Sequence, residues 1–370
     1  MVKTVVVRIV ICILVLLMVI SALLLLYRES KKQEIRSQST EIVEKGGISE
    51  HRKININGLE QHLVVEGQRK NAPVLLFLHG GPGTPVPFGA SSRGLYPELT
   101  KEATVVYWDQ RGAGKSYKGT QAKDLTVEQM VEDTLAVTRY LKKEFKQEKI
   151  CLSGVSWGTI PGLLAVSRAP ELYHAYYPYA QATRQDGADT IVYNWLLGKH
   201  QDPDMEVLKT TEQDKKTLAE MGPPPFTKEQ DDKFSEISDR TLGKNEHPAK
   251  MSNFLLPIFF SPDYSLSEIY TTIFKGSELN MQKSNLVNEV LALNLSEEIT
   301  EIEVPITFFN GRYDKVVPVS QVREFMEKLK APKKELVFAE HSGHMPNSDD
   351  MKYVMKQMAS KIKQQEEALE

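Results

Sequence analysis

Three short apolar runs, each followed by a glycine-rich turn, constrain the fold of this chain most. They lie at residues 74–78 (VLLFL), 103–108 (ATVVYW) and 149–153 (KICLS). A continuous apolar run of this length that ends at glycines is typical of a strand buried on both faces of a parallel sheet. Two more runs of this kind occur at 305–309 and 335–338. The sequence therefore predicts a core of parallel strands.

Helical patterns alternate with these runs. Thr126 is placed to cap a helix whose apolar stripe continues over 127–145, and further amphipathic stretches cover 319–330 and 350–363. Strands that alternate with helices predict an α/β fold, a mostly parallel sheet with helices on both faces. An alternating segment at 51–66 that turns at Asn-Gly predicts a β-hairpin, and hence an antiparallel edge.

A change of pattern divides the chain. Residues 176–299 have no strand-like run; they are rich in Lys and Glu, have helical periodicity and are broken by prolines such as those at 223–225. We expect a helical cap inserted into the α/β domain there. The first part of the core would then be 49–175 and the second part 300–370.

The N-terminus predicts a membrane anchor. Residues 9–27 carry no charge, and a helix of that length spans ~28 Å, close to the hydrocarbon thickness of a bilayer. We expect an uncleaved transmembrane signal anchor over 1–28 and a solvated linker over 29–48. The protein would be a single-pass protein of the cell membrane with its large domain extracytoplasmic. The alternative is a long signal peptide that is removed.

Composition excludes several classes of function. With 46 basic and 49 acidic residues the net charge is −3, which gives no electrostatic footprint for nucleic acid. The two cysteines, Cys12 and Cys151, exclude a disulfide scaffold and a cysteine-type zinc site. We expect no metal and no cofactor, and the sequence leaves the oligomeric state open.

A possible nucleophile lies in the sequence GVSWG at 154–158. It follows the apolar strand ICLS and precedes the apolar helical segment TIPGLLAVS. That setting is typical of a nucleophile elbow, in which a sharp turn exposes a serine and the flanking glycines let strand and helix approach each other closely. The candidate nucleophile is Ser156, and the alternative is a plain glycine-rich turn.

A serine hydroxyl needs a base and a group that orients the base. In this architecture the acid precedes the histidine along the chain. Asp314 follows the strand at 305–309, and His344 follows the strand at 335–338. Both therefore fall at the carboxyl ends of strands, where open α/β sheets place their sites. His341 is the alternative base, but Gly343 before His344 favours a sharp loop there.

An oxyanion hole is the fourth requirement. One donor is expected to be the backbone N–H of Trp157, the residue after the nucleophile. The second is expected from the loop HGGPG at 79–83, where glycines let the backbone turn an N–H inward. Gly81 is the candidate, because Pro82 has no N–H to donate.

Three motifs carry a resemblance to a known family. HGGPG at 79–83, WDQRGAGKS at 108–116 and GVSWGT at 154–159 resemble the proline iminopeptidase (prolyl aminopeptidase) family of α/β-hydrolases. The resemblance covers roughly residues 50–175 and 300–365. It implies an α/β-hydrolase fold with a helical cap, with Ser156, Asp314 and His344 as the catalytic triad and Gly81 and Trp157 as oxyanion donors. It also implies an ion pair between Asp109 and Arg111 that holds their loop.

The chain departs from that family in two respects. Val155 stands where the family usually has glycine, and family members are usually soluble. In these aminopeptidases acidic cap residues receive the free amino group of the substrate, and the sequence does not single one out among several: Glu206, Glu220, Asp231 and Glu278. Apolar cap residues either line a substrate pocket or form the core of the cap itself: Tyr193, Trp195, Phe226, Phe254, Phe259, Phe260 and Met281.

Two classes of function remain. The first is a serine hydrolase that acts on a small peptide or ester through an acyl-enzyme. Within it we expect an aminopeptidase that releases an N-terminal residue such as proline, and the alternative is a carboxylesterase for small esters. The second class is a membrane-tethered binding protein that keeps the fold without the chemistry. Fold alone does not separate the two classes.

Overall fold

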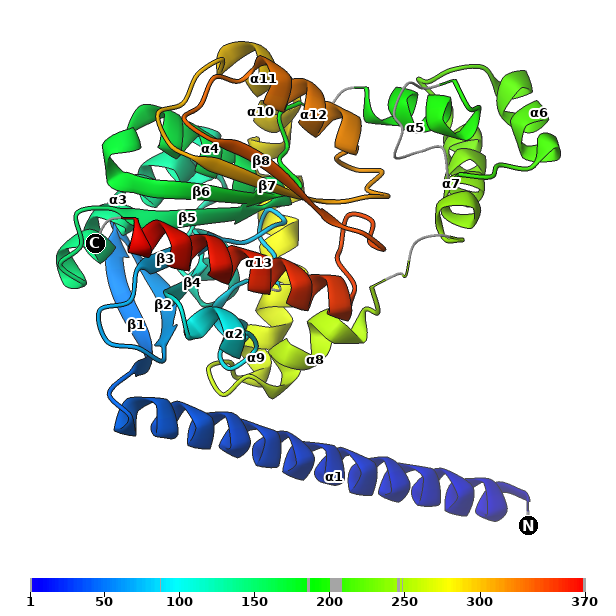
Figure 1. The fold of residues 1–370 in the computed structure, drawn as a ribbon. Helices are drawn as coiled ribbons and strands as arrows, with labels where there is room; N and C mark the ends of the chain where they lie inside the picture. The colour runs from blue at the N-terminus through cyan, green and yellow to red at the C-terminus, as the bar shows by residue number, and fades with distance from the viewer. Residues whose placement is uncertain are drawn as a thin grey trace.

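An eight-stranded β-sheet forms the centre of the molecule (Figure 1). The computed structural model describes residues 2–86, 88–184, 187–199, 208–244, 247 and 249–368. The strand order is β1-β2-β4-β3-β5-β6-β7-β8, with β2 antiparallel to β1 and β4 and the other neighbours parallel. The strands are β1 Ile48–Ile56, β2 Leu59–Gly67, β3 Val74–Leu78, β4 Thr104–Asp109, β5 Ile150–Val155, β6 Tyr173–Tyr179, β7 Ile306–Gly311 and β8 Lys334–Ala339.

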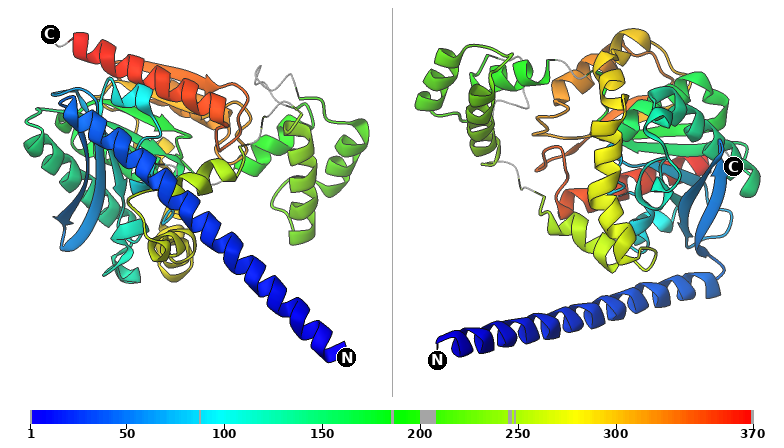
Figure 2. Two further views of the ribbon diagram at one scale, coloured as in Figure 1. Left: turned by 90° about the horizontal axis from the view of Figure 1, so that it is seen from below. Right: turned by 180° about the vertical axis from the view of Figure 1, so that it is seen from behind.

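Helices cover both faces of this sheet (Figures 1 and 2). On one face α2 packs against α13 and on β4; on the other α3 packs against α4, and both contact β5. These helices span α2 Pro97–Thr100, α3 Val127–Glu144, α4 Thr159–Arg168 and α13 Ser348–Glu367, with α12 Val319–Lys328 on β7. Every residue of β3, β4, β5 and β7 is buried, as two covered faces require. The predicted fold class is confirmed.

Strand β6 is the element that the sequence pattern misses. Its sequence, YHAYYPY, has neither an aliphatic run nor strict alternation. It is nevertheless almost entirely buried, because it pairs with β5 on one side and β7 on the other. The expected start of the cap at residue 176 is therefore wrong, since the sheet continues to Tyr179 and the insertion begins after it.

The insertion between β6 and β7 has two parts: Figures 1 and 2 show the first standing apart from the core and the second lying along it. The helices α5 Ala188–Leu196, α6 Glu212–Met221 and α7 Lys228–Leu242 form a lobe with its own small apolar core. Then α8 Ser252–Phe260, α9 Leu266–Tyr270, the π-helical segments η7 Thr271–Lys275 and η8 Glu278–Lys283, α10 Leu286–Ala292 and α11 Leu295–Glu298 lie along the main core.

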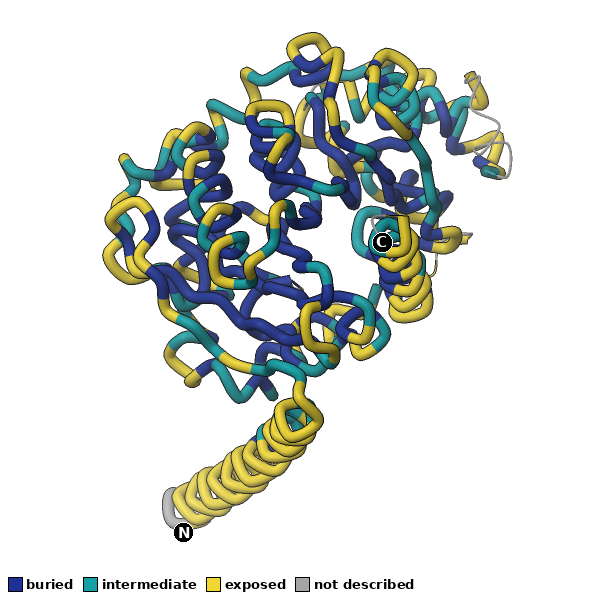
Figure 3. Tube along the Cα trace, turned by 60° about the vertical axis from the view of Figure 1, so that its left-hand side comes forward, coloured by how far each residue is buried: buried dark blue, intermediate teal, exposed yellow. Residues whose placement is uncertain are grey.

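The N-terminal helix α1 (Val2–Glu44) has two unlike halves. Its apolar half is exposed and projects away from the core (Figures 1 and 3). Among the described residues, Val5–Glu44 is the segment long and apolar enough to cross a membrane. The second half, over residues 29–44, was expected to be a linker, but it is helical, and α1 as a whole packs on β1 and α8.

The helical second half has a local cause. Lys, Arg, Gln and Glu are good helix formers, and pairs at helical spacing support the turns, as between Lys31 and Glu34 or Lys45 and Glu41. Only Ile35 and Ile42 mark the side that faces the core, and both are half-buried. Two apolar residues are too few to show as a periodic pattern in the sequence.

Candidate active site

Ser156 lies at the sharp turn between β5 and α4. Its φ is +50°, a left-handed conformation that side chains other than glycine rarely adopt. The flanking glycines are required by space: a Cβ on Gly154 would lie 2.6 Å from the carbonyl oxygen of Gly158, and a Cβ on Gly158 would lie 2.3 Å from that of Leu78. The strained turn therefore exposes the serine hydroxyl at the carboxyl edge of the sheet, where the sequence placed it.

The structure brings Ser156, His344 and Asp314 together. Nε2 of His344 lies 2.9 Å from Oγ of Ser156, and Nδ1 of His344 lies 2.9 Å from Oδ2 of Asp314. The other carboxylate oxygen of Asp314 accepts hydrogen bonds from the backbone N–H groups of Val316 and Val317, each at 2.8 Å. A carboxylate held in this way is fixed in orientation and holds the proton of the imidazole on Nδ1. The Nε2 lone pair then faces the serine.

The electrostatics of His344 suit a base that takes up a proton. Burial alone lowers the pKa of the imidazole, but the charge of Asp314 and its hydrogen bond outweigh burial, so the pKa is raised above 6.5. A protonated His344 is thus stabilised by a neighbour that is itself fully buried.

The alternative base, His341, lies elsewhere. Its ring is exposed and stacks on that of His247 with 4.9 Å between centroids, and its backbone carbonyl accepts from the N–H of His247 at 2.7 Å. Its own N–H donates to Asp350. Of the two histidines, it is His344 that reaches Ser156.

The expected oxyanion donors border the same pocket as the serine. Gly81 and Trp157 both line it beside Ser156. Gly81 has a φ of +117°, and a Cβ there would lie 2.9 Å from the backbone nitrogens of Gly83 and Thr84, so the loop needs a glycine at this position.

A buried polar network joins this loop to the elbow, and the sequence did not reveal it. Gln110 donates its backbone N–H to Nε2 of His79 at 3.2 Å and its side-chain amide to the carbonyl of His79 at 3.1 Å. The indole N–H of Trp157 donates to the amide oxygen of Gln110 at 3.2 Å. Burial lowers the pKa of His79 to about 4, so its ring is neutral and Nδ1–H donates to the carbonyl of Gly80. All three motifs are thereby held in one arrangement.

The expected ion pair between Asp109 and Arg111 is wrong. Arg111 forms two hydrogen bonds with Asp133 on α3, at 2.8 and 3.1 Å. Asp109 accepts from the backbone N–H groups of Ala90 and Lys115 at 2.8 Å each and from the hydroxyl of Tyr264. Burial raises the pKa of Asp109 to about 6, against the effect of these donors. Asp109 is thus satisfied mainly by backbone amides, although Arg111 is only two positions away. The partner of Arg111 comes from helix α3 instead.

The pocket at Ser156 is small and apolar. Its volume is about 190 Å³. The core side contributes Gly81, Pro82, Trp157, Ile160, Val316 and Val317, and the insertion contributes Ala182, Met281, Val287, Val290 and Leu291. None of the described lining residues is acidic. A larger groove of about 530 Å³ lies under α1, away from the serine.

The candidate cap acids lie outside this lining. Glu220 faces Lys216 at 3.9 Å, Glu278 pairs with Lys283 at 2.8 Å, and Asp231 is exposed on α7. Glu206 lies outside the described residues. Of the cap's apolar residues, Met281 lines the pocket, whereas Tyr193 and Trp195 belong to the core of the α5–α7 lobe. In the part of the chain that the structure describes, no group of three or more His, Cys, Asp or Glu side chains is placed to hold a metal ion.

Comparisons with known proteins agree with the fold described above. A family model described as the alpha/beta hydrolase fold matches residues 73–196. A curated relative, the probable aminopeptidase YbaC of Bacillus subtilis (strain 168), is 28% identical over 312 residues, which cover 84% of this chain and 95% of the relative.

Solved structures share the fold at low identity. One is a membrane phospholipase A described as a bacterial virulence factor, which is 18% identical in sequence and superposes with a TM-score of 0.55. The alignment covers 95% of this chain and 99% of that chain. Another is a proline iminopeptidase-related protein of Thermus thermophilus, which is 19% identical and superposes with a TM-score of 0.52. The alignment covers 86% of this chain and 99% of that chain. The family model and these structures agree on the α/β-hydrolase fold. The chain therefore has an α/β-hydrolase fold, and it is similar to a curated protein described as a probable aminopeptidase.

Proposed function

We propose that this protein is a serine hydrolase that acts through an acyl-enzyme. The observation that carries the proposal is the continuous hydrogen-bonded series from Ser156 through His344 to Asp314, with both imidazole contacts at 2.9 Å. The three side chains come from loops after β5, β7 and β8, and only folding brings them together. A binding module needs no such arrangement.

The chemistry follows from the positions. Ser156 attacks the carbonyl carbon of the substrate while Nε2 of His344 takes the hydroxyl proton. Asp314 keeps the proton on Nδ1 and stabilises the imidazolium. His344 then gives its proton to the leaving amine or alcohol, and a water molecule, activated by the same base, hydrolyses the acyl-enzyme. Groups of the chain itself carry out each of these steps.

Two backbone N–H groups, those of Gly81 and Trp157, stabilise the oxyanion of the tetrahedral intermediate in this proposal. Each such donor is worth ~3 kcal/mol of barrier when it is fixed before the reaction. The network of His79 and Gln110 supports that fixation, because it holds the Gly81 loop and the indole of Trp157 on one side chain.

The substrate class that we put first is a short peptide from which an N-terminal residue such as proline is released. The three motifs and the aminopeptidase relative support it, and an apolar pocket of about 190 Å³ suits a prolyl ring. A small ester is the second candidate, favoured by one observation: the described pocket lining offers no carboxylate for the amino group of a peptide.

Chromogenic substrates separate the two classes. Purified full-length protein is assayed with proline p-nitroanilide and with p-nitrophenyl acetate, each against the variant Ser156→Ala. Release of nitroaniline that depends on Ser156 supports the aminopeptidase. Turnover of the acetate alone supports the carboxylesterase, and turnover of neither contradicts both assignments.

We also propose that α1 anchors the protein in the cell membrane as a single span. The apolar half is long enough to cross a bilayer and is exposed throughout its most apolar window. An N-terminal signal anchor usually delivers the following domain across the membrane, so the catalytic domain would lie on the extracytoplasmic side. Protease digestion of intact cells tests this orientation: the catalytic domain should be cleaved, and protection until lysis would contradict it.

A further inference from the structure

A row of exposed apolar side chains lies on the insertion, outside the active-site pocket. Leu255 and Leu256 belong to α8, Leu266 and Tyr270 to α9, and Phe274 to η7; each is 40–58% exposed. We call these five residues the apolar stripe. Single exposed apolar residues are common on protein surfaces, but a group on two neighbouring helices needs a partner.

The stripe has the geometry of one helix face. Leu266, Tyr270 and Phe274 are spaced four residues apart on a continuous helical rod, and the rings of Tyr270 and Phe274 lie 5.2 Å apart. The opposite face of the rod is in the core, where Ile269 and Thr272 are buried. Helix α8, with the sequence SNFLLPIFF, carries no charged residue.

Contacts with α1 place this face beside the membrane. Arg28, the first residue after the apolar span, donates to the carbonyl of Phe259 at 2.7 Å and to that of Tyr264 at 2.6 Å. Its neighbour Tyr27 packs edge-on against Phe260 with 5.4 Å between ring centroids. The point at which the span leaves the bilayer is therefore bonded to the C-terminal end of α8 and to the turn that leads into α9.

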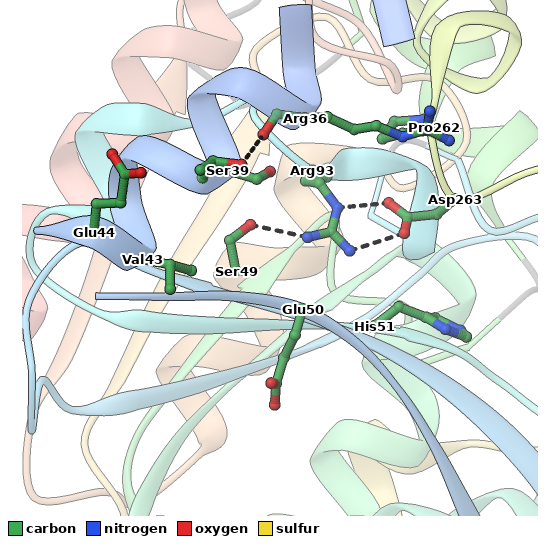
Figure 4. A pocket seen from close by; sticks show the side chains of 11 residues that line it. Arg36, Ser39, Val43, Glu44, Ser49, Glu50, His51, Arg93, Pro262 and Asp263 are labelled. Atoms are coloured by element: carbon green, nitrogen blue, oxygen red, sulfur yellow. Dashed lines mark hydrogen bonds and ion pairs between the residues drawn. The ribbon is translucent and has the colours of Figure 1, made fainter. Parts of the chain in front are cut away.

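A buried ion pair makes this attachment rigid. Arg93 forms a bidentate pair with Asp263 at 2.7 and 2.8 Å and also donates to Ser49 of β1 at 2.9 Å, as Figure 4 shows. Both charged side chains are less than a tenth exposed. Because Asp263 precedes Tyr264, the segment that binds Arg28 is itself fixed to the sheet, and α8 and α9 cannot swing away from the span.

We propose that the apolar stripe docks on the lipid bilayer at the interface where α1 enters it. Interfacial helices bury an apolar face of this kind at the boundary between headgroups and acyl chains. Lys275, whose ammonium lies 5.7 Å from the ring centroid of Tyr270, is placed to meet anionic headgroups. The proposal rests on the membrane anchor in the proposed function and is independent of the chemistry at Ser156.

Docking has a consequence for the active site. The rod that carries the stripe continues through η8 to Met281, which lines the pocket of Ser156. A docked stripe would therefore connect the lipid surface to one wall of this pocket through a single helical rod.

Nitroxide depth measurements test the proposal on the full-length chain in vesicles of phosphatidylcholine with phosphatidylglycerol. Labels are attached to Leu255→Cys and to Phe274→Cys in a background with Cys12→Ser, and Cys151 is buried. A label at Leu17→Cys reports insertion of the span, and a label at Lys143→Cys, exposed on α3, is the matched control. Collision with oxygen, which partitions into lipid, is compared with collision with aqueous Ni-EDDA.

The quantity compared is the ratio of the collision rate with oxygen to the collision rate with Ni-EDDA. We expect this ratio to be at least several-fold higher for the labels at positions 255 and 274 than for the label at position 143. The label at position 17 could lie deep in the bilayer while the labels at positions 255 and 274 are as exposed to water as the label at position 143. That result would overturn docking and leave the anchor in place. An aqueous label at position 17 would overturn both. Labels at 255 and 274 shielded from both reagents would show a protein partner instead, and would also overturn the proposal.

Discussion

The two sides of the active-site pocket differ in what they contribute. The sheet side carries the groups that we propose to react: Ser156, Asp314 and His344 stand on loops that follow β5, β7 and β8, and the carboxylate of Asp314 is satisfied by two backbone amides. The insertion side contributes only apolar side chains, among them Met281 and Leu291, which are 47% and 61% exposed.

This difference between the two sides implies that the sheet side sets the reaction rate and the insertion side sets the substrate preference. Hydrogen bonds fix the positions of Ser156, His344 and Asp314 relative to one another, so a change there should alter the rate with any substrate. An exposed apolar wall can change with little effect on the sheet, so a change there alters which substrate is preferred. Variants on the two sides should therefore have separable effects.

The largest expected effect is on the sheet side. Ser156→Ala removes the nucleophile, and we expect kcat to fall by at least ~10⁴-fold while the melting temperature changes little. Steady-state kinetics on whichever chromogenic substrate is turned over measure the loss. Retention of more than a tenth of the wild-type rate would contradict the assignment.

Removal of the orienting carboxylate should come next. Asp314→Asn keeps the shape but no longer holds the proton of His344 on Nδ1, and we expect kcat to fall by ~10⁴-fold or somewhat less. Asp349→Asn, a nearby exposed carboxylate at the start of α13, is the control and should keep wild-type kcat. Equal effects of the two substitutions would show that Asp314 has no special role.

The pH dependence of the rate tests the pairing of His344 with Asp314 on the sheet side. His344 must be neutral to accept the proton of Ser156, and its pKa is raised above 6.5 because Asp314 outweighs the effect of burial. We therefore expect kcat/KM to rise with pH through a midpoint above 6.5. In Asp314→Asn the charge is gone and burial dominates, so the midpoint should move to lower pH. A midpoint that does not move would contradict the pairing.

The smallest expected effect is on the insertion side. Met281→Ala enlarges the pocket, and we expect the preference between a small and a larger acyl group to shift by ~10-fold toward the larger one. The kcat for the small substrate should change less than threefold. Tyr353→Ala, an exposed residue of α13, is the control and should not alter the preference. A uniform loss of rate with both substrates would contradict the separation between the side that carries out the reaction and the side that selects the substrate.

The sequence predicts the sheet side well, because its signals are local. Apolar runs mark the strands, and glycines mark the close approaches at Gly154 and Gly158. The order Ser, Asp, His follows from loops at strand ends. The strands and the close approaches can each be recognised within about ten residues of the chain, and the order Ser, Asp, His then needs only the sequence positions of the loops.

What the sequence did not reveal depends on distant partners. β6 is a strand because β5 and β7 flank it, and Arg111 finds Asp133 on a helix that begins well after the loop. At the junction between the two halves of α1, Arg28 bonds to residues more than two hundred positions away. On the insertion side, no pattern showed that Met281 and Leu291 would meet at the pocket while Tyr193 and Trp195 pack elsewhere.

Reaction of the full-length protein with a fluorophosphonate, followed by mass spectrometry of its peptides, tests most directly whether Ser156 is an activated nucleophile. A neighbouring base is needed for rapid phosphonylation. We expect one adduct per chain on the peptide that contains Ser156, and none in Ser156→Ala. Absence of labelling in the wild type, or equal labelling of Ser156→Ala, would contradict the assignment and favour a protein that keeps the fold for binding alone.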